Sequence, residues 1–341
     1  MPLRTCFVLV ALLIASSLQV GAQDIHFSQY FASPLTLNPA MTGNFGGDFR
    51  IAANYRNQWF GQVSNNSPFE TYSGSFDISV LPDRLNNDQA GVGLMVYSDK
   101  AGDGNLSTQS AMASAAYHKS LDNRNKYQLS VGIQGGIVQK RIDFSKLKFE
   151  EQYNGDGGFN TALDNKEQVE SNTLLYPDFN IGLQGQAMFS ENVNAHVGFG
   201  HFHMFRPNES FLKNGENKVE PRTVAHGGVN VAIGEYFGLS PGFLYMHQAN
   251  ANELTVGSAF RYMINRSTSA YLGAWHRLQD AVIPYAGFEI EGVRVGVSYD
   301  ITVSRLATAA NHVGGFEISA VYIHNAQPPQ ELNPTRYCPR F

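Results

Sequence analysis

Alternating apolar and polar positions dominate the sequence after about residue 49 and predict a long series of β-strands. The pattern is clearest in residues 178–200, where Asn180 lies between Phe179 and Ile181 and the alternation continues. A period of two is typical of a strand. The polar turn at residues 190–192 leads into a second alternating run, so the two runs are predicted to form a hairpin.

The less apolar face of this hairpin has an unusual composition for a soluble sheet. It carries asparagine, glutamine, glycine and histidine, with few of the lysines and glutamates that normally cover an exposed face. A strand with one apolar face and one uncharged polar face is suited to a wall between lipid and a polar lumen. The hairpin therefore indicates a membrane β-barrel.

Similar runs recur along the chain and predict an all-β fold, a transmembrane antiparallel β-barrel of about 14 strands, which is the even number that single-chain bacterial barrels prefer. The predicted strands are residues 49–57, 71–80, 90–98, 107–119, 127–140, 176–190, 193–203, 222–233, 237–248, 253–264, 270–276, 281–290, 293–301 and 314–323.

The lengths of the connections support this strand count. If the first strand runs outward, the long connections 141–175, 204–221 and 302–313 all fall on one side of the membrane. The other side has short turns, with 81–89 the longest. Outer-membrane barrels have long extracellular loops and short periplasmic turns, so we expect the long connections outside the cell.

Aromatic residues lie near many predicted strand ends, where they are expected to form girdles at the two membrane interfaces. The alternative is that they are the ordinary core aromatics of a soluble β-sandwich. These residues are Trp59, Tyr97, Tyr127, Tyr176, Tyr236, Tyr262, Tyr271 and Tyr299.

Composition agrees with a membrane barrel. Charged residues make up 16% of the chain, against about 25% in soluble proteins. The chain also contains 33 glycines and 12% aromatic residues. The formal net charge of −5 gives no electrostatic reason to expect nucleic acid as a partner.

The two ends of the chain do not follow the strand pattern. Residues 1–22 have a basic start, an apolar run and a small-residue end, which predicts a cleaved secretory signal peptide. Residues 23–48 form an N-terminal periplasmic or plug segment, residues 49–323 the barrel, and residues 324–341 a proline-rich periplasmic tail. After cleavage Cys338 is the remaining cysteine, either free or paired with a partner's cysteine.

The sequence contains no recognisable catalytic motif, so we expect neither an enzyme nor a cofactor. His201 and His203 stand two apart and are expected to share one strand face, with His196 on the other. A metal site would need further ligands, which the sequence does not place.

Several short stretches resemble those of one protein family. They are His26-Phe27-Ser28-Gln29-Tyr30, Leu37-Asn38-Pro39-Ala40 with Gly43, Tyr55-Arg56-Asn57-Gln58-Trp59, Ser98-Asp99-Lys100 with Gly102, the stretches 135–140 and 142–147, Tyr176-Pro177-Asp178-Phe179 and Cys338-Pro339-Arg340-Phe341. In combination and in this order they resemble the PorP/SprF family of Bacteroidota outer-membrane proteins, along nearly the whole mature chain.

This resemblance implies an outer-membrane component of the type IX secretion and gliding machinery. Such a protein supports secretion or surface attachment of proteins with a C-terminal sorting domain, such as gliding adhesins. The implied partners are outer-membrane lipid, the periplasmic peptidoglycan-binding and ring components of the machinery, and the secreted adhesin.

An even strand count places both chain ends on the periplasmic side, where they are predicted to form a machinery-facing surface. The candidate partner-binding residues are Phe27, Gln29, Tyr30, Asn38, Pro39, Cys338, Pro339, Arg340 and Phe341. The alternative for the N-terminal segment is that it only plugs the lumen. The alternative for the whole protein is a passive porin or nutrient channel.

Overall fold

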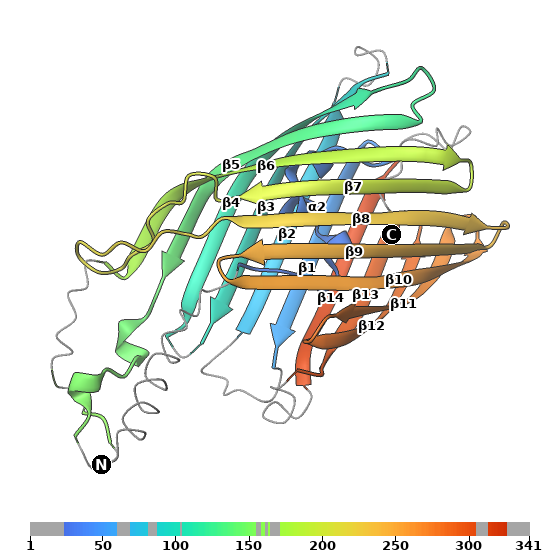
Figure 1. Ribbon diagram of the computed structural model, residues 1–341. Coiled ribbons are helices and arrows are strands. Elements are labelled where there is room, and N and C mark those ends of the chain that lie inside the picture. The colour runs from blue at the N-terminus through green and yellow to red at the C-terminus, as the bar shows by residue number, and fades with distance from the viewer. Residues whose placement is uncertain are drawn as a thin grey trace, which may run out of the picture.

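The computed structural model describes residues 24–59, 69–80, 87–102, 104–154, 158–160, 163, 171–304 and 313–325. These residues form one closed barrel of antiparallel strands, in which each strand pairs with its neighbours in sequence and β1 closes the ring by pairing with β14 (Figure 1). The predicted 14-stranded antiparallel barrel is confirmed.

The strands differ from the predicted ranges by a few residues at their ends, where pairing with a neighbour rather than local pattern sets the boundary. They are β1 (Phe49–Gln58), β2 (Phe69–Val80), β3 (Gln89–Ala101), β4 (Leu106–Ser120), β5 (Tyr127–Arg141), β6 (Thr173–Ser190), β7 (Val193–Phe202), β8 (Arg222–Ile233), β9 (Phe237–Gln248), β10 (Ala251–Asn265), β11 (Thr268–Arg277), β12 (Ala281–Ile290), β13 (Val293–Thr302) and β14 (Val313–His324).

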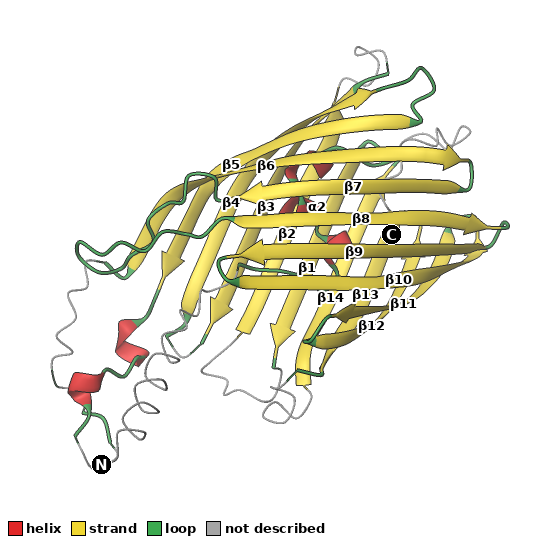
Figure 2. Cartoon of the chain, in the orientation of Figure 1, coloured by secondary structure: helices red, strands yellow, loops and turns green. Residues whose placement is uncertain are grey.

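Helices are few and short in the described part of the chain (Figure 2). Three lie before β1: η1 (Tyr30–Ala32), α2 (Pro34–Leu37) and η2 (Pro39–Met41). Two more, η3 (Phe144–Lys146) and η4 (Glu150–Gln152), follow β5. Within the described residues, none is both long and apolar enough to span a membrane.

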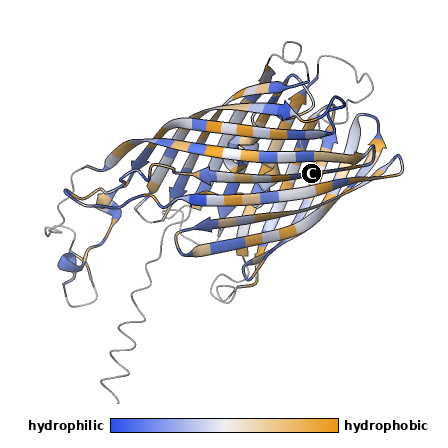
Figure 3. Ribbon diagram, turned by 45° about the horizontal axis from the view of Figure 1, so that its top comes forward, coloured by the Kyte–Doolittle hydropathy of each residue, from blue (hydrophilic) through white to orange (hydrophobic). Residues whose placement is uncertain are grey.

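The two faces of each strand differ as the alternation predicts. On β6 the side chains of Phe179 and Leu183 are 43% and 48% exposed on the outside of the barrel, whereas Asn180 and Gln184 are buried inside. Figure 3 shows the same alternation of apolar and polar positions along the other strands. Lipid would cover the outer, apolar face.

The girdle prediction was wrong for three of the aromatic residues. Tyr176 and Tyr271 are buried inside the barrel, and Tyr97 packs against the inner cluster that contains Leu35. Each occupies an inward position of its strand, and nearness to a strand end does not determine which way a side chain points. Of the tyrosines in the predicted girdles, Tyr127, Tyr236, Tyr262 and Tyr299 are exposed on the outside.

The two ends of the barrel differ as the connection lengths predict. One end, here called the long-loop end, carries the connections after β5, β7 and β13. The opposite short-turn end carries tight turns such as those after β6, β8 and β12 (Figure 1). The chain enters β1 at the short-turn end, where the backbone N–H of Asp48 donates to the carbonyl of His324 over 2.8 Å.

Candidate functional site inside the barrel

Residues 24–47, here called the luminal segment, run through the interior of the barrel. At one end the backbone N–H of Asp24 donates to Oε1 of Gln248, the last residue of β9 at the long-loop end, over 2.7 Å. At the other end the segment continues into β1 at the short-turn end. The segment therefore extends from one mouth of the barrel to the other.

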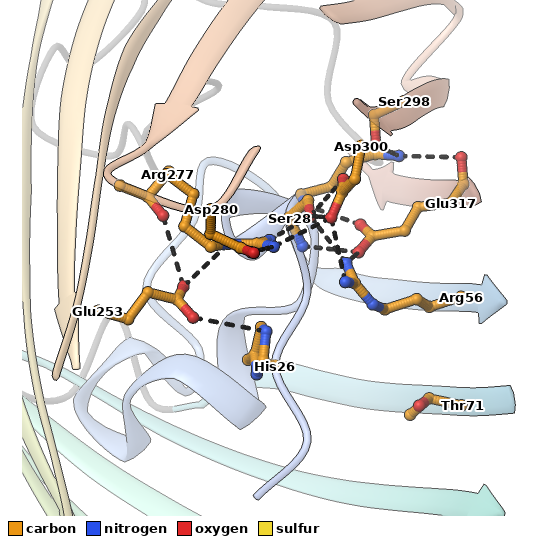
Figure 4. A network of polar contacts seen from close by, with 12 residues as sticks. His26, Ser28, Arg56, Thr71, Glu253, Arg277, Asp280, Ser298, Asp300 and Glu317 are labelled. Atoms are coloured by element: carbon orange, nitrogen blue, oxygen red, sulfur yellow. Dashed lines mark hydrogen bonds and ion pairs between the residues drawn. The ribbon is translucent and has the colours of Figure 1, made fainter. Parts of the chain in front are cut away.

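Charged side chains from four strands hold the start of this segment (Figure 4). The backbone N–H of Ser28 donates to Glu317 over 2.7 Å, and its hydroxyl donates to Asp300 over 2.7 Å. The same hydroxyl accepts hydrogen bonds from Arg56 and Arg277 over 2.7 and 2.6 Å. One small side chain of the segment thus lies between two buried cations and two buried anions.

The cations and anions also bind each other. Arg56 forms ion pairs with Glu317 and, over 3.0 Å, with Asp300. Arg277 lies 3.1 Å from Asp300 and 3.3 Å from Glu253. Because each charge has a partner, the network offsets a desolvation cost of several kcal/mol per ion.

A second buried cluster holds the first described residue. Nε2 of His203 donates to Oδ2 of Asp24 over 2.5 Å, and its Nδ1 lies 2.9 Å from Oδ2 of Asp178. Arg222 lies 3.6 Å from the same Asp24 oxygen. Burial alone would lower the pKa of His203, but the two carboxylates outweigh it and raise that pKa to about 9. His203 is therefore a cation at neutral pH.

The sequence analysis placed His203 on the wrong face. Strand β7 ends at Phe202, and His203 has a φ of 59°, in the left-handed region. This backbone conformation breaks the alternation and turns His203 into the lumen, while His201 remains on the outer face, where its Nδ1 lies 3.1 Å from the Thr223 hydroxyl. A strand pattern carries no signal for such a turn.

The middle of the luminal segment touches the barrel backbone directly. Nδ2 of Asn38 donates to the carbonyl of Leu183 over 3.0 Å, and Oδ1 of Asn38 accepts from the backbone N–H of Ala40 over 2.9 Å. A Cβ added at Gly182 would lie 1.9 Å from that Oδ1, and one added at Gly132 would lie 2.3 Å from the carbonyl carbon of Pro39. Glycine in these strands permits the close approach of a second backbone.

The segment leaves the barrel through a further set of polar contacts. Arg50 binds Asp77 over 2.7 Å and donates to the carbonyl of Met41 over 2.9 Å. The backbone N–H of Gly43 donates to the same Asp77 carboxylate over 2.7 Å. The hydroxyl of Thr42 donates to that of Ser114 over 3.0 Å.

Apolar side chains of the segment fill the space between these polar contacts. Phe31 packs against Trp275 and Tyr285, with ring centroids 5.0 and 5.4 Å away. Leu35 and Phe45 belong to two other buried clusters with side chains of the barrel wall. The inner face is therefore partly apolar, because it packs against the luminal segment.

Three cavities between the segment and the wall have volumes of about 30, 30 and 20 Å³. Each has room for about one water molecule. The luminal segment therefore fills these parts of the interior, and it is also called the plug for this position.

A family model described as "Type IX secretion system membrane protein PorP/SprF" matches residues 19–322 of the chain. The chain belongs to this family. As a PorP/SprF protein with a closed β-barrel, it is an outer-membrane component of the type IX secretion system.

This PorP/SprF barrel is also similar to solved structures of low sequence identity. The toluene transporter TbuX of Ralstonia pickettii is 11% identical, with 85% of this chain and 92% of that chain covered and a TM-score of 0.48. The toluene transporter TodX of P. putida is 8% identical, with 85% and 93% covered and a TM-score of 0.49. A comparison with curated protein sequences finds no match.

The structure places the predicted partner-binding residues of this PorP/SprF protein in two groups. Phe27, Gln29, Tyr30, Asn38 and Pro39 lie within the barrel, and four of the five are fully buried. The barrel wall covers this segment in the structure, and partner binding by these five residues stays a prediction.

The remaining candidates, Cys338, Pro339, Arg340 and Phe341, lie outside the described residues, as does the predicted signal peptide at residues 1–22. Among the residues that the structure describes, no group of three or more histidine, cysteine, aspartate or glutamate side chains is arranged to hold a metal ion.

Sequence reasoning missed the charged residues that hold the plug. Arg56 and Asp300 are inward positions on β1 and β13, where an ionisable residue is costly unless it is paired. Arg277, at the end of β11, belongs to the same set. The available signal was a charged residue at a lumen-facing position of a predicted membrane strand.

Proposed function

We propose that this protein supports the secretion or surface attachment of proteins with a C-terminal sorting domain, such as gliding adhesins. We also propose that its barrel stays closed and that other components of the machinery bind to it. Family membership carries the first part of this proposal. The luminal segment supports the proposal of a closed barrel, because it lies in the interior and buried ion pairs surround it.

A passive porin or nutrient channel remains the second candidate. A channel requires a continuous aqueous path, whereas these two cavities beside the plug have room for about one water molecule each. The segment would have to leave the lumen to open such a path. Its buried charges would then lose partners on the barrel wall, which disfavours spontaneous opening.

We propose that the partners are the periplasmic peptidoglycan-binding and ring components and that they contact the protein at the short-turn end. This end faces the periplasm if the long connections lie outside the cell. Strand β14, the last described strand, ends at His324 on the same side of the barrel. We propose no catalytic role for any residue.

The first experiment compares a strain that lacks this gene with its parent. We expect one or a few proteins with C-terminal sorting domains to disappear from the extracellular proteome and surface spreading to decrease, with small-solute uptake unchanged. Normal secretion with slower uptake would instead establish the channel function.

A second experiment locks the plug in place. The hydroxyls of Thr42 and Ser114 lie 3.0 Å apart, so Thr42→Cys with Ser114→Cys places two thiols within reach of a disulfide. In a Cys338→Ser background, we expect the oxidised double variant to secrete as well as the reduced one. Loss of secretion on oxidation alone would show that the plug must move.

A further inference from the structure

The outer surface of the barrel has a depression over β2 to β6, near the long-loop end. Its volume is about 410 Å³. Two rows of outward-facing residues line it, and each row runs across paired strands. The upper row is Tyr72, Ser98, Gln109, Gln139 and Leu175, and the lower row includes Gly74, Val96, Ala111 and Ile137.

The depression exists because short side chains lie between long ones. Gly74 and Ala111 leave the floor low, whereas Tyr72 on β2 and Leu175 on β6 form the two sides, with exposed fractions of 48% and 66%. Most of its lining is apolar carbon. The shape and surface suit a hydrocarbon chain.

Two cations stand above this depression. Ser107 on β4 pairs with Lys100 on β3 and with Arg141 on β5, so the three residues form the next row toward the long-loop end. Two strand spacings separate the two cations, or about 10 Å between their backbones. Both side chains are exposed, and within the described residues neither is close enough to a carboxylate for an ion pair, although Arg141 interacts electrostatically with Asp143 just beyond the end of β5.

One anion lies in the same row. Glu70 on β2 pairs with Lys100, but its carboxylate accepts hydrogen bonds from Asn57 and from the hydroxyls of Tyr55 and Tyr72. The hydrogen bonds of the Glu70 carboxylate thus lie on the side of the row away from Arg141. The row keeps a net positive charge beside the depression.

The height of these cations on the barrel matches a membrane interface. On β5 the outward positions are apolar or glycine from Tyr127 to Ile137, and Gln139 and Arg141 follow. Ten residues of a tilted strand rise about 25 Å, which is the height of the apolar band of an outer-membrane barrel. Lys100 and Arg141 therefore lie at headgroup level on the long-loop side.

We propose that this depression binds a phosphorylated lipid of the outer leaflet. A phosphate lies between Lys100 and Arg141, and an acyl chain lies over Ala111 between Tyr72 and Leu175. The polar row of Ser98, Gln109 and Gln139 meets the region where headgroup and chain join. The assignment rests on charge complementarity next to an apolar hollow of matching height and does not depend on the proposed role in secretion.

The test uses the purified full chain in uncharged detergent micelles, with bound lipid counted by native mass spectrometry. The two probes are diphosphoryl lipid A and the same lipid after removal of both phosphates. We expect the phosphorylated probe to bind about tenfold more tightly, or better, because two cations attract its phosphate groups. Equal binding of the two probes would overturn the proposal.

Two variants locate the site. Lys100→Gln with Arg141→Gln is expected to abolish the preference for phosphate, and Ala111→Trp is expected to weaken binding at least about fivefold although both cations remain. The charge-matched control is Arg124→Gln with Lys126→Gln, in the turn after β4 at the opposite end, which should keep the preference.

All these positions lie outside the lumen, so the variants should retain the heat-modifiable migration of a folded barrel. If the control variant loses the phosphate preference as fully as the Lys100 and Arg141 variant, the attraction is one of overall charge and the proposal fails. If Ala111→Trp binds as well as the parent, the hollow is not the chain site. Because no cargo is present, failure here leaves the secretion proposal unaffected.

Discussion

The two halves of the luminal segment are held by different forces. Residues 24–33 bind the barrel through charges, with Ser28 among Arg56, Arg277 and Asp300, and with Asp24 against His203. Residues 34–40 bind mainly through close fit, with backbone and Asn38 atoms against glycines of β5 to β7, and the buried Arg50–Asp77 pair then binds Met41 and Gly43.

This difference determines how each half responds to change. A buried ion pair depends on both partners remaining charged, so the first half is sensitive to charge removal and to pH. A backbone packed on glycine depends on free volume, so the second half is sensitive to one added methyl group. The start of the plug thus depends on charge and its middle depends on shape, and three predictions separate the two.

The largest effect is expected from Arg56→Met. This change leaves Asp300 and Glu317 buried with one of their two cations removed, at a cost of about 3–5 kcal/mol. The free energy of unfolding, from a denaturant titration in micelles, measures it. Arg206→Met is the control, because Arg206 and its partner Glu220 are each 46% exposed, and it should cost less than about 1 kcal/mol.

A double variant sharpens this prediction. Arg56→Met with Glu317→Gln removes one charge of each sign and keeps an acceptor oxygen for one of the two backbone N–H groups, of Ser28 and Gln29, that Glu317 binds. It should recover at least about 1 kcal/mol relative to Arg56→Met alone. No recovery, or an Arg56→Met cost no larger than that of Arg206→Met, would show that charge does not hold this half.

A smaller effect is expected from Gly182→Ala in the second half. The new Cβ would lie 1.9 Å from Oδ1 of Asn38, so the segment must shift, at a cost of about 1–3 kcal/mol. Hydrogen exchange should increase in residues 34–47 and much less in residues 24–33. Gly185→Ala is the matched control on the same strand, because its Cβ would meet nothing closer than 3.9 Å, at Val197. Equal responses of the two variants would rule out the close-fit explanation.

The smallest effect is a pH dependence that His203 gives to the first half. Its pKa is raised to about 9, so its stabilisation is complete below its ordinary pKa of about 6.5 and is lost as pH rises through about 9. The partner Asp24 has a pKa held well below its usual range, opposed by burial but lowered by His203 and Arg222. Its contribution therefore persists from neutral pH down to strongly acidic pH.

We expect the parent to be more stable than His203→Gln at pH 7 by on the order of 1 kcal/mol, a value reduced by the partial exposure of Asp24. The difference should disappear by about pH 10. Thermal unfolding of both proteins between pH 6 and pH 10 measures it. A difference that stays constant over this range would mean that His203 acts through packing and not through its charge.

Much of the fold follows from local patterns. Alternation on β6 and β7 predicted both the strands and the face that meets lipid, and the parity of long and short connections supported the strand count. These features depend on a residue and its near neighbours in sequence, because successive side chains of a strand point to opposite faces. Each of these features can therefore be predicted from local stretches of the sequence.

The interior did not follow from such patterns. Gly132 lies against Pro39, and the alternation along its strand does not name that partner. Tyr176 and His203 were placed on the wrong face or at the wrong interface. Nothing local distinguishes a lumen-facing tyrosine from one at the membrane surface.

The sequence by itself therefore determined the barrel, its strand number and its family, because these depend on period, spacing and short motifs along the chain. Only the tertiary structure decided that residues 24–47 fill the lumen and that Ser28 meets Arg56, Arg277 and Asp300. Those contacts join residues up to 272 positions apart. They exist because closure of the barrel brings distant strands around a common interior. Local sequence patterns do not predict which residues meet there.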